Sequence, residues 1–256
     1  MRVKSALDFF EWELVKIGRF FLKLSDDLLW KPKRSISIDQ LINSYGHKES
    51  FFFIQVGAND GVTGDHLHNY IKKNKWHGIL MEPVPYIFEK LKENYRTQPN
   101  LIFENSAIGK ENGLVPFYSI SEYNSEGVKH DQFANGLAQL GSFDKKTLLQ
   151  HSAMHPEFKN FIKEIKVPTI TLNDLFLKYS VTNLDLLLID TEGYDFEILN
   201  NTNFEKIKPA ILIFEHQHIS RNDYKILIRK LKSYGYKFFV NRWDTFSVLN
   251  KTNLGQ

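Results

Sequence analysis

From residue 51 onward, short apolar runs alternate with segments in which apolar residues recur every three or four positions. The apolar runs predict strands near 51–56, 78–82, 100–105, 184–190, 210–215, 236–241 and 244–249. The segments between them predict helices near 63–74, 84–97, 171–179, 193–201 and 221–234. Strands that alternate with helices are typical of an α/β fold built on a parallel sheet.

The composition of the strands indicates how the sheet is covered. LDLLLID (184–190) and AILIFE (210–215) are nearly continuous apolar runs, as expected when helices cover both faces of a parallel sheet. Only the region 242–244 joins the last two strands, so they should form an antiparallel hairpin. We therefore expect a mainly parallel, seven-stranded sheet with one reversed strand at its end and helices on both faces.

The first 50 residues follow a different pattern. One helical stripe is apolar and consists of Phe9, Phe10, Leu14, Ile17, Phe20, Phe21 and Leu24. A short second helix is predicted at 37–45. We interpret 1–50 as a helical extension and 51–256 as one α/β domain. The extension is expected to pack on that domain or on a second copy of the chain, giving a homo-oligomer; peripheral contact with a membrane surface is the alternative, because basic residues flank the stripe.

The region 106–168 interrupts the alternation of strands and helices. GKENGLVPFYSI (109–120) predicts a β-excursion, and a long polar stretch follows it. A connection of this length is usually functional or disordered, and in an enzyme it would form a lid or a substrate wall. Within it, AQLGSFDKKTLLQH (138–151) is predicted to close over the site, with Asp144 capping a helix.

Composition and charge exclude several classes of protein. The absence of cysteine excludes disulfides, thiolate metal ligands and a cysteine nucleophile. The net charge is only +3, and the Lys-rich segments KNFIKEIK and YKILIRKLK are interpreted as solvated helix faces, so no nucleic-acid partner is expected. No segment reaches the roughly 20 apolar residues of a membrane span, and charges interrupt the first 30 residues too often for a signal peptide. A cytoplasmic location is therefore expected.

Small and acidic residues follow the first two strands, where ligands bind in open α/β sheets. Gly57 and Gly61 have the spacing G-x-x-x-G, which differs from the G-x-G-x-x-G of dinucleotide-binding proteins. Glu82 lies 21 residues beyond Gly61, where an acid can accept hydrogen bonds from both ribose hydroxyls. The pattern predicts a nucleotide-like cofactor; a tight strand-to-helix turn without a ligand is the alternative.

Acidic residues and histidines follow the fourth and fifth strands. Asp190 and Glu192 end one strand, and Glu215, His216 and His218 end the next. Three carboxylates without a Lys or Arg among them need a cation, a shared proton or a donor-rich substrate. A hard divalent ion is one solution. In the alternative interpretation, Glu192 and the nearby Asp195 only cap the following helix.

Six motifs in order carry a resemblance to a known family: VGANDG, MEPVP, NSAIG, VPTITLNDL, DLLLIDTEGYDFEIL and FEH. Together they resemble the FkbM-type methyltransferases, over roughly residues 51–240. The resemblance implies a class I, Rossmann-like methyltransferase fold and S-adenosylmethionine as methyl donor. It also implies an O-methyltransferase acting on hydroxyls of sugars or natural products, with a carbohydrate or glycoconjugate acceptor in polysaccharide or glycan pathways.

The resemblance also implies roles for single residues. The methionine part of the cofactor would meet Gly57, Ala58, Asn59, Asp60 and Gly61. The ribose would meet Glu82 and Pro83, and the adenine would meet Asn105, Ser106 and Ala107. Asp190 would lie where cofactor and acceptor meet. Gln55 departs from the pattern, because many members carry an acid there that often contacts the methionine end of the cofactor.

A sugar hydroxyl needs a base, a metal ion or both to become a nucleophile. His218 is our first candidate for the base and His216 the second, with Asp190 at the reacting centre. Asp190, Glu192 and Glu215 are the candidate ligands of Mg²⁺ or Mn²⁺. Two other function classes remain open: an NAD-type Rossmann oxidoreductase, and a non-catalytic cofactor-fold protein that binds a partner. The glycine spacing and the lack of an obvious Tyr-x-x-x-Lys pair argue against the oxidoreductase.

Overall fold

The computed structural model describes residues 37–45, 50–120, 139–151 and 156–250. They belong to one compact unit that spans Ile36–Gln256. The amphipathic helix predicted around residues 9–24 lies outside the described residues, so its role stays a prediction. Within the described part of the chain, no helix is both long and apolar enough to cross a membrane.

The main sheet contains all seven strands that the apolar runs predict. They are β1 (Phe52–Val56), β2 (His77–Met81), β3 (Leu101–Glu104), β8 (Leu186–Ile189), β9 (Ile211–Glu215), β10 (Tyr236–Asn241) and β11 (Asp244–Leu249). Their order is β10-β11-β9-β8-β1-β2-β3. Strand β11 is antiparallel to both β9 and β10, so the one reversed strand lies one position in from the edge.

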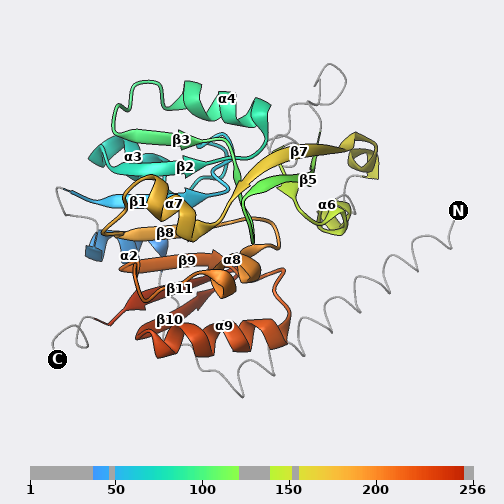
Figure 1. The fold of residues 1–256 in the computed structure, drawn as a ribbon. Helices are drawn as coiled ribbons and strands as arrows, with labels where there is room; N and C mark the ends of the chain where they lie inside the picture. Colours follow the sequence, from blue (N-terminus) through green and yellow to red (C-terminus); the bar gives the residue numbers. More distant parts are fainter. Residues whose placement is uncertain (1–36, 46–49, 121–138, 152–155, 251–256) are drawn as a thin grey trace, which may run out of the picture. The chain divides into compact units, whose positions relative to one another are not determined.

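Helices cover both faces of this sheet. One face packs on α2 (Ile38–Tyr45), α3 (His68–Asn74) and α4 (Pro85–Asn94), through a core that includes Leu41, Phe53, Ile71, Leu91 and Leu186. Figure 1 shows α7 (Leu172–Lys178), α8 (Asp195–Asn201) and α9 (Arg221–Ser233) in front of the sheet, with α2 behind it. Alternate strand residues bury toward opposite faces, which is why the central strands read as continuous apolar runs.

Helix α3 is shorter than the pattern predicts, because it begins at His68 and not near residue 63. Side chains hold the preceding residues in turns: the Asp60 carboxylate accepts the N–H groups of Val62 and Thr63, and Asp65 Oδ1 accepts the N–H of Leu67 at 2.7 Å. Such local hydrogen bonds compete with helix formation.

A second sheet arises from the region that interrupts the alternation. It contains β4 (Ala107–Ile108), β5 (Gly113–Ile120), β6 (Gly141–Ser142) and β7 (Ile162–Ile170), in the order β4-β7-β5-β6. The predicted β-excursion is therefore present as β5, which pairs antiparallel with β7 from Gly113↔Thr169 to Ile120↔Ile162. In Figure 1, β5 and β7 lie beyond the arrowheads of the parallel strands.

The interpretation of KNFIKEIK as a helix face is wrong. Its first part belongs to a 3₁₀ helix, η2 (Pro156–Phe161), and the rest enters β7, while α6 (Lys145–His151) precedes both. Ile165 and Val167 point inward between exposed Lys and Glu residues, which is the period of a strand. The spacing of three residues between Ile162 and Ile165 also occurs on the apolar face of a helix, which explains the wrong prediction. YKILIRKLK does lie in a helix, α9.

The second sheet is fixed to the main domain by an apolar cluster. Phe117 of β5 and Val167 of β7 pack with Val84 and Ile87 at the start of α4, together with Ala107. This packing places one face of the second sheet across the carboxyl ends of the parallel strands.

Candidate active site

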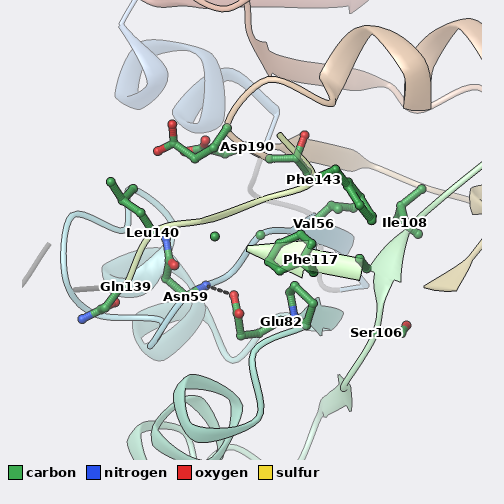
Figure 2. A pocket seen from close by; sticks show the side chains of 16 residues that line it. Val56, Asn59, Glu82, Ser106, Ile108, Phe117, Gln139, Leu140, Phe143 and Asp190 are labelled. Atoms are coloured by element: carbon green, nitrogen blue, oxygen red, sulfur yellow. Dashed lines mark hydrogen bonds between the residues drawn. The ribbon is translucent and has the colours of Figure 1, made fainter. Parts of the chain in front are cut away.

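A pocket lies between the carboxyl ends of the main sheet and the second sheet (Figure 2). It holds about 540 Å³ of space free of protein atoms, including its open mouth. The residues that line it are Val56, Gly57, Asn59, Glu82, Pro83, Ser106, Ala107, Ile108, Phe117, Gln139, Leu140, Gly141, Phe143, Asp190, Thr191 and Glu192.

The glycines of the first turn are required by the protein's own packing. Gly57 and Gly61 have φ angles of +79° and +71°, which favour glycine. A Cβ on Gly57 would lie 1.9 Å from the Asp190 carbonyl oxygen, and one on Gly61 would lie 2.3 Å from the Tyr95 ring. The space beside both glycines is therefore filled by protein. The turn still forms one side of the pocket, through Val56, Gly57 and Asn59.

Asp60 holds this turn in shape. Its Oδ1 accepts the N–H groups of Val62 and Thr63 at 2.9 and 2.7 Å, and its Oδ2 accepts the hydroxyl of Thr63 and the amide of Gln139, both at 2.8 Å. These bonds keep the pKa of Asp60 below its usual value despite burial. Asp60 does not line the pocket, and neither do Ala58 and Gly61.

Glu82 is a buried carboxylate aimed at the pocket. Its Oε2 accepts the N–H of Asn59 at 3.1 Å and its Oε1 accepts the N–H of Val84 at 2.8 Å; Figure 2 shows the first of these bonds. Burial raises the pKa of Glu82 to about 8, and the charge of Asp60 adds to the rise. Each oxygen keeps a lone pair for a ligand hydroxyl, which suits the predicted contact with a ribose.

The residues after β3 complete this end of the pocket. Ser106 and Ala107 line it, whereas Asn105 lies behind it and donates to the carbonyls of Glu82 and Pro83 at 2.8 and 3.2 Å. Asn105 therefore fixes the turn that presents Glu82. It supports the site from outside the lining.

The second sheet supplies an aromatic wall that sequence reasoning only partly found. Phe117 and Phe143 meet edge to face with ring centroids 5.0 Å apart, and Phe143 also packs against Tyr194 at 4.4 Å. Gln139 and Leu140 continue this wall. The segment 138–151 was predicted to close over the site, and its described part does line the pocket. Phe117 and Ile108 were missed; the alternation in 113–120 was the only signal for Phe117, whereas Ile108 lies in the motif NSAIG.

This wall is hydrogen-bonded to the acidic side of the site. Ser142 Oγ donates to the backbone carbonyl of Glu192 at 2.9 Å and accepts the N–H of Asp144 at 3.1 Å. Asp144 Oδ1 in turn accepts the N–H of Lys146 at 2.8 Å, so it caps α6 as its position predicts. The wall and the loop that carries Glu192 are thus held together.

Acidic side chains gather beyond the pocket, at the ends of β8 and β9. Glu192 has a φ angle of +50°, a strained backbone for a non-glycine residue. The Nε2 atom of His218 lies 3.5 Å from Glu192 Oε2 and 3.9 Å from Glu215 Oε2. One ligand atom from each of these three residues lies within 4.8 Å of the other two. Two of the three predicted metal ligands, Glu192 and Glu215, therefore meet there, and His218 takes the place predicted for Asp190.

The carboxylates of this cluster repel one another. Burial raises the pKa of Glu215 to about 9, and the charges of Asp190 and Glu192 add to the rise. The pKa of Asp190 is also raised, first by burial and then by Glu192. Asp190 lines the pocket and is exposed to solvent, and Figure 2 shows it across the pocket from Glu82.

Asp195 fixes the geometry of this cluster. Its Oδ2 accepts the hydroxyl of Thr191 at 2.7 Å and its Oδ1 accepts the N–H of Glu215 at 3.2 Å. It thus ties the end of β8 to the end of β9. It does more than cap a helix, and Glu192 points into the cluster.

His216 lies on the other side of its strand from His218. Its Nδ1 is 3.2 Å from the Thr245 hydroxyl, which also pairs with Tyr224. Burial lowers its pKa to about 4, so the ring is neutral at pH 7. The geometry brings His218 to the acidic cluster and keeps His216 away from it.

The solved structures that resemble the chain do so at low sequence identity. The FkbM methyltransferase from Methylobacillus flagellatus KT is 14% identical, over 79% of this chain and 44% of that chain, with a TM-score of 0.48. The Methanococcus jannaschii fibrillarin pre-rRNA processing protein is 14% identical, over 79% and 67%, with a TM-score of 0.39. The chain thus spans less than half the length of the Methylobacillus protein. No curated protein matches the sequence.

The family model described as "Methyltransferase FkbM domain" matches residues 55–238. That stretch contains the first turn, Glu82, the second sheet and the acidic cluster. It also confirms the resemblance carried by the six sequence motifs. The strand order, with its reversed strand between β9 and β10, is that of a class I methyltransferase. Because the match covers more than half of the chain, the protein belongs to the FkbM methyltransferase family.

Proposed function

We propose that the protein is an S-adenosylmethionine-dependent O-methyltransferase whose acceptor is a hydroxyl of a sugar or glycoconjugate. The observation that carries this proposal is the continuity of the site. A pocket lined by Glu82 at one side reaches Asp190, Thr191 and Glu192 at the other, and Glu192 belongs to the acidic cluster. A cofactor site and a group that activates a hydroxyl are thereby joined.

The lining residues fit the cofactor. Glu82 offers a lone pair on each oxygen to the two ribose hydroxyls, and its buried position excludes competing water. Ser106, Ala107 and Ile108 offer small and apolar contacts to the adenine. When bound, the cofactor supplies a methyl group that is already strongly electrophilic. The protein's task is then to align the acceptor oxygen and to remove its proton.

His218 and a metal ion are two competing ways to remove that proton. As a base, His218 would accept the proton on Nε2, with Glu192 and Glu215 stabilising the imidazolium. As a metal site, the same Nε2 and the two carboxylates would bind Mg²⁺ or Mn²⁺, which lowers the pKa of a bound hydroxyl. One nitrogen cannot do both. Asp190, at the edge of the pocket, would orient the acceptor in either case.

The charge of the site favours a neutral, polyhydroxylated acceptor. None of the residues that line the pocket, all of them within the described chain, is a Lys or Arg. Asp190, Glu192 and Glu215 would repel the phosphates of a nucleic acid, whereas sugar hydroxyls donate hydrogen bonds to carboxylates. We therefore propose a carbohydrate acceptor and no nucleic-acid partner, with the reaction placed in the cytoplasm.

The test is methyl transfer from radiolabelled S-adenosylmethionine to a panel of glycosides, nucleotide sugars and RNA. We expect label on a sugar hydroxyl and release of S-adenosylhomocysteine. Label on RNA alone would overturn the acceptor class. Calorimetry with S-adenosylmethionine and NAD is the companion measurement, and binding of NAD alone would favour the oxidoreductase.

A chelation series separates the two ways of activating the hydroxyl. If a metal acts, EDTA abolishes turnover and Mg²⁺ or Mn²⁺ restores it. If His218 acts as a base, exhaustively chelated enzyme keeps its full rate.

A further inference from the structure

The turn between β10 and β11 exposes a tryptophan at the carboxyl end of the parallel strands. Trp243 is 39% exposed, whereas Trp76, the other tryptophan among the described residues, is buried. The N–H of His216 donates to the carbonyl of Trp243 at 2.8 Å, which fixes the turn against the end of β9. In Figure 1, this turn lies at the same end of the sheet as the arrowhead of β9.

The turn has an unusual sequence for a tight hairpin. Turns with two central residues favour Asn-Gly, Asp-Gly or a leading glycine, because their first central residue has a positive φ angle. Here that residue is Arg242, with a φ angle of +45°. A long side chain is uncommon in this conformation, and backbone strain of this kind gathers at functional sites. The turn therefore carries its two large side chains at a conformational cost.

The indole of Trp243 is held by a cation and not by the apolar core. The guanidinium of Arg242 lies 4.9 Å from the centroid of the indole ring, a cation–π contact. Trp243 belongs to none of the apolar clusters formed by the described residues. Its exposed ring surface is therefore oriented by its neighbour and open to a ligand.

The turn lies beside the carboxylates of the site. Asp244, the residue after Trp243, is paired with Glu215 across the ladder of β11 and β9. Paired residues of antiparallel strands have Cα atoms about 5 Å apart. The charge of Asp244 acts on both Glu215 and Asp190, and Asp190 lines the pocket. Trp243 thus lies outside the pocket, one residue from the cluster at which the acceptor hydroxyl is proposed to react.

We propose that Trp243 binds a second sugar ring of the acceptor, adjacent to the ring that is methylated. A pyranose has hydroxyls at its edge and C–H groups on its faces, and the exposed indole offers an apolar surface to such a face. The N–H groups of Arg242 lie beside it and donate hydrogen bonds to hydroxyls at the edge. The acceptor is then an oligosaccharide or glycoconjugate, and a free monosaccharide binds less tightly. This inference rests on the proposed function.

The alternative is that the contact between Arg242 and Trp243 only stabilises the hairpin, or that the turn contacts a second copy of the chain. These roles differ in what a substitution changes. A structural role changes the melting temperature and affects every acceptor alike, and a contact between copies changes the oligomeric state. A role in sugar binding affects only acceptors long enough to reach the turn.

The test is methyl transfer to acceptors of two lengths. The probes are methyl β-glucoside, methyl β-galactoside and methyl α-mannoside, each compared with the trisaccharide of the same sugar. For the sugar that accepts label, wild-type protein should have a KM about 10-fold lower with the trisaccharide, the size expected for one aromatic contact. Trp243→Ala should remove this difference. The KM of the monosaccharide and the Kd of S-adenosylhomocysteine should stay within a factor of about two.

Three further variants complete the series. Trp243→Phe keeps an aromatic face and should keep most of the preference for the trisaccharide. Trp243→Asn introduces a residue favoured in hairpin turns and should lose the preference as Ala does, even if Ala loosens the turn. Leu177→Ala is the matched control, because Leu177 is 72% exposed on α7, which leads into the opposite end of β8. It should change none of these quantities.

Equal KM values for the two lengths in wild-type protein would overturn the inference and leave the proposed function intact. An equal loss with both lengths in Trp243→Ala and Trp243→Asn would overturn it as well. Thermal melting and light scattering measure folding and oligomeric state, and a change in either with an unchanged preference would assign the turn a structural role. Label on none of the sugars would overturn the proposed acceptor, and this inference with it.

Discussion

Two glutamates at strand ends, the buried Glu82 after β2 and the half-buried Glu215 in β9, show how the same residue type is held for different purposes. Burial raises the pKa of both, to about 8 and about 9. Both oxygens of Glu82 accept backbone N–H groups, whereas Glu215 Oε2 is buried, makes no hydrogen bond with the described residues and lies near His218. The two N–H groups therefore fix the Glu82 side chain in a position to bind a ligand. The cluster around Glu215 has an excess of negative charge that needs a cation or a proton.

Removing the histidine of the cluster should have the largest effect on turnover. We expect His218→Ala to lower turnover by about 10²-fold or more while the affinity for S-adenosylmethionine stays unchanged, because the residue acts on the acceptor hydroxyl. Steady-state kinetics and calorimetry measure the two quantities. His216→Ala is the matched control and should keep most of its activity, because His216 contacts Thr245 on the other side of β9. A large loss of turnover in His216→Ala, with little loss in His218→Ala, would assign the catalytic role to His216.

The opposite pattern is expected for Glu82→Gln. One carboxylate oxygen becomes an NH₂ group that faces a backbone N–H, so the hydrogen bonds to the ribose are disturbed. We expect the Kd for S-adenosylmethionine to rise about 10-fold, as for the loss of one hydrogen bond. Turnover at saturating cofactor should change much less than in His218→Ala. An unchanged Kd would remove Glu82 from the cofactor site.

The raised pKa values of the two glutamates should make the stability of the folded protein depend on pH. Both glutamates keep a proton in the folded state at pH values where the unfolded chain has already released it, above about 4.5. The folded state therefore loses stability as pH rises from about 4.5 to about 9. Glu82→Gln should make stability depend less on pH up to about pH 8, and Glu215→Gln should do so up to about pH 9. Melting temperatures measured across the range test both.

Addition of Mn²⁺ at pH 8 tests whether Glu215, but not Glu82, is part of a metal site. If the cluster binds metal, the ion should raise the melting temperature of wild type and of Glu82→Gln. It should leave Glu215→Gln nearly unchanged, because a carboxamide is a weak metal ligand. A rise of equal size in all three proteins would indicate metal binding elsewhere.

The smallest expected effect concerns the bond between the second sheet and the cluster. Ser142→Ala removes the hydrogen bond to the Glu192 carbonyl and should cost about 1 kcal/mol of stability, with a several-fold loss of turnover as Glu192 shifts. Ser119→Ala, on the neighbouring strand β5, is the matched control. Denaturant unfolding and kinetics measure both variants, and equal turnover in the two would show that Ser142 does not position Glu192.

The main sheet could be predicted from the sequence because its signals are local. A buried strand such as Leu186–Ile189 is a continuous apolar run, and the residues after it lie at the sheet edge wherever the fold is parallel. Glu82, Glu192 and Glu215 were found in this way. His218 was also found, and a histidine close to the carboxylates was predicted, but its distances to Glu192 and Glu215 depend on the direction of the loop after β9 and could not be predicted.

The second sheet could not be predicted in the same way. The partner of β5 begins at Ile162, more than forty residues later in the chain, and no local pattern reveals such a pairing. The site residues on this sheet, Phe117 above all, are therefore invisible to strand-end reasoning. The start of α3 was misplaced for a related reason: the apolar period predicts a helix from residue 63, and only the hydrogen bonds of the turn show that the chain is not yet helical there.

The long pairing of β5 with β7 has a consequence for how the protein folds. The connections β1–β2, β2–β3 and β8–β9 of the main sheet each contain one short helix, whereas the β5–β7 ladder, like the pairing of β1 with β8, must close a much longer loop before any of its bonds can form. Non-local pairings of this kind form slowly. The aromatic wall of the pocket, which depends on that ladder, is thus among the last parts to assemble. During refolding, cofactor binding should return later than the helical signal does.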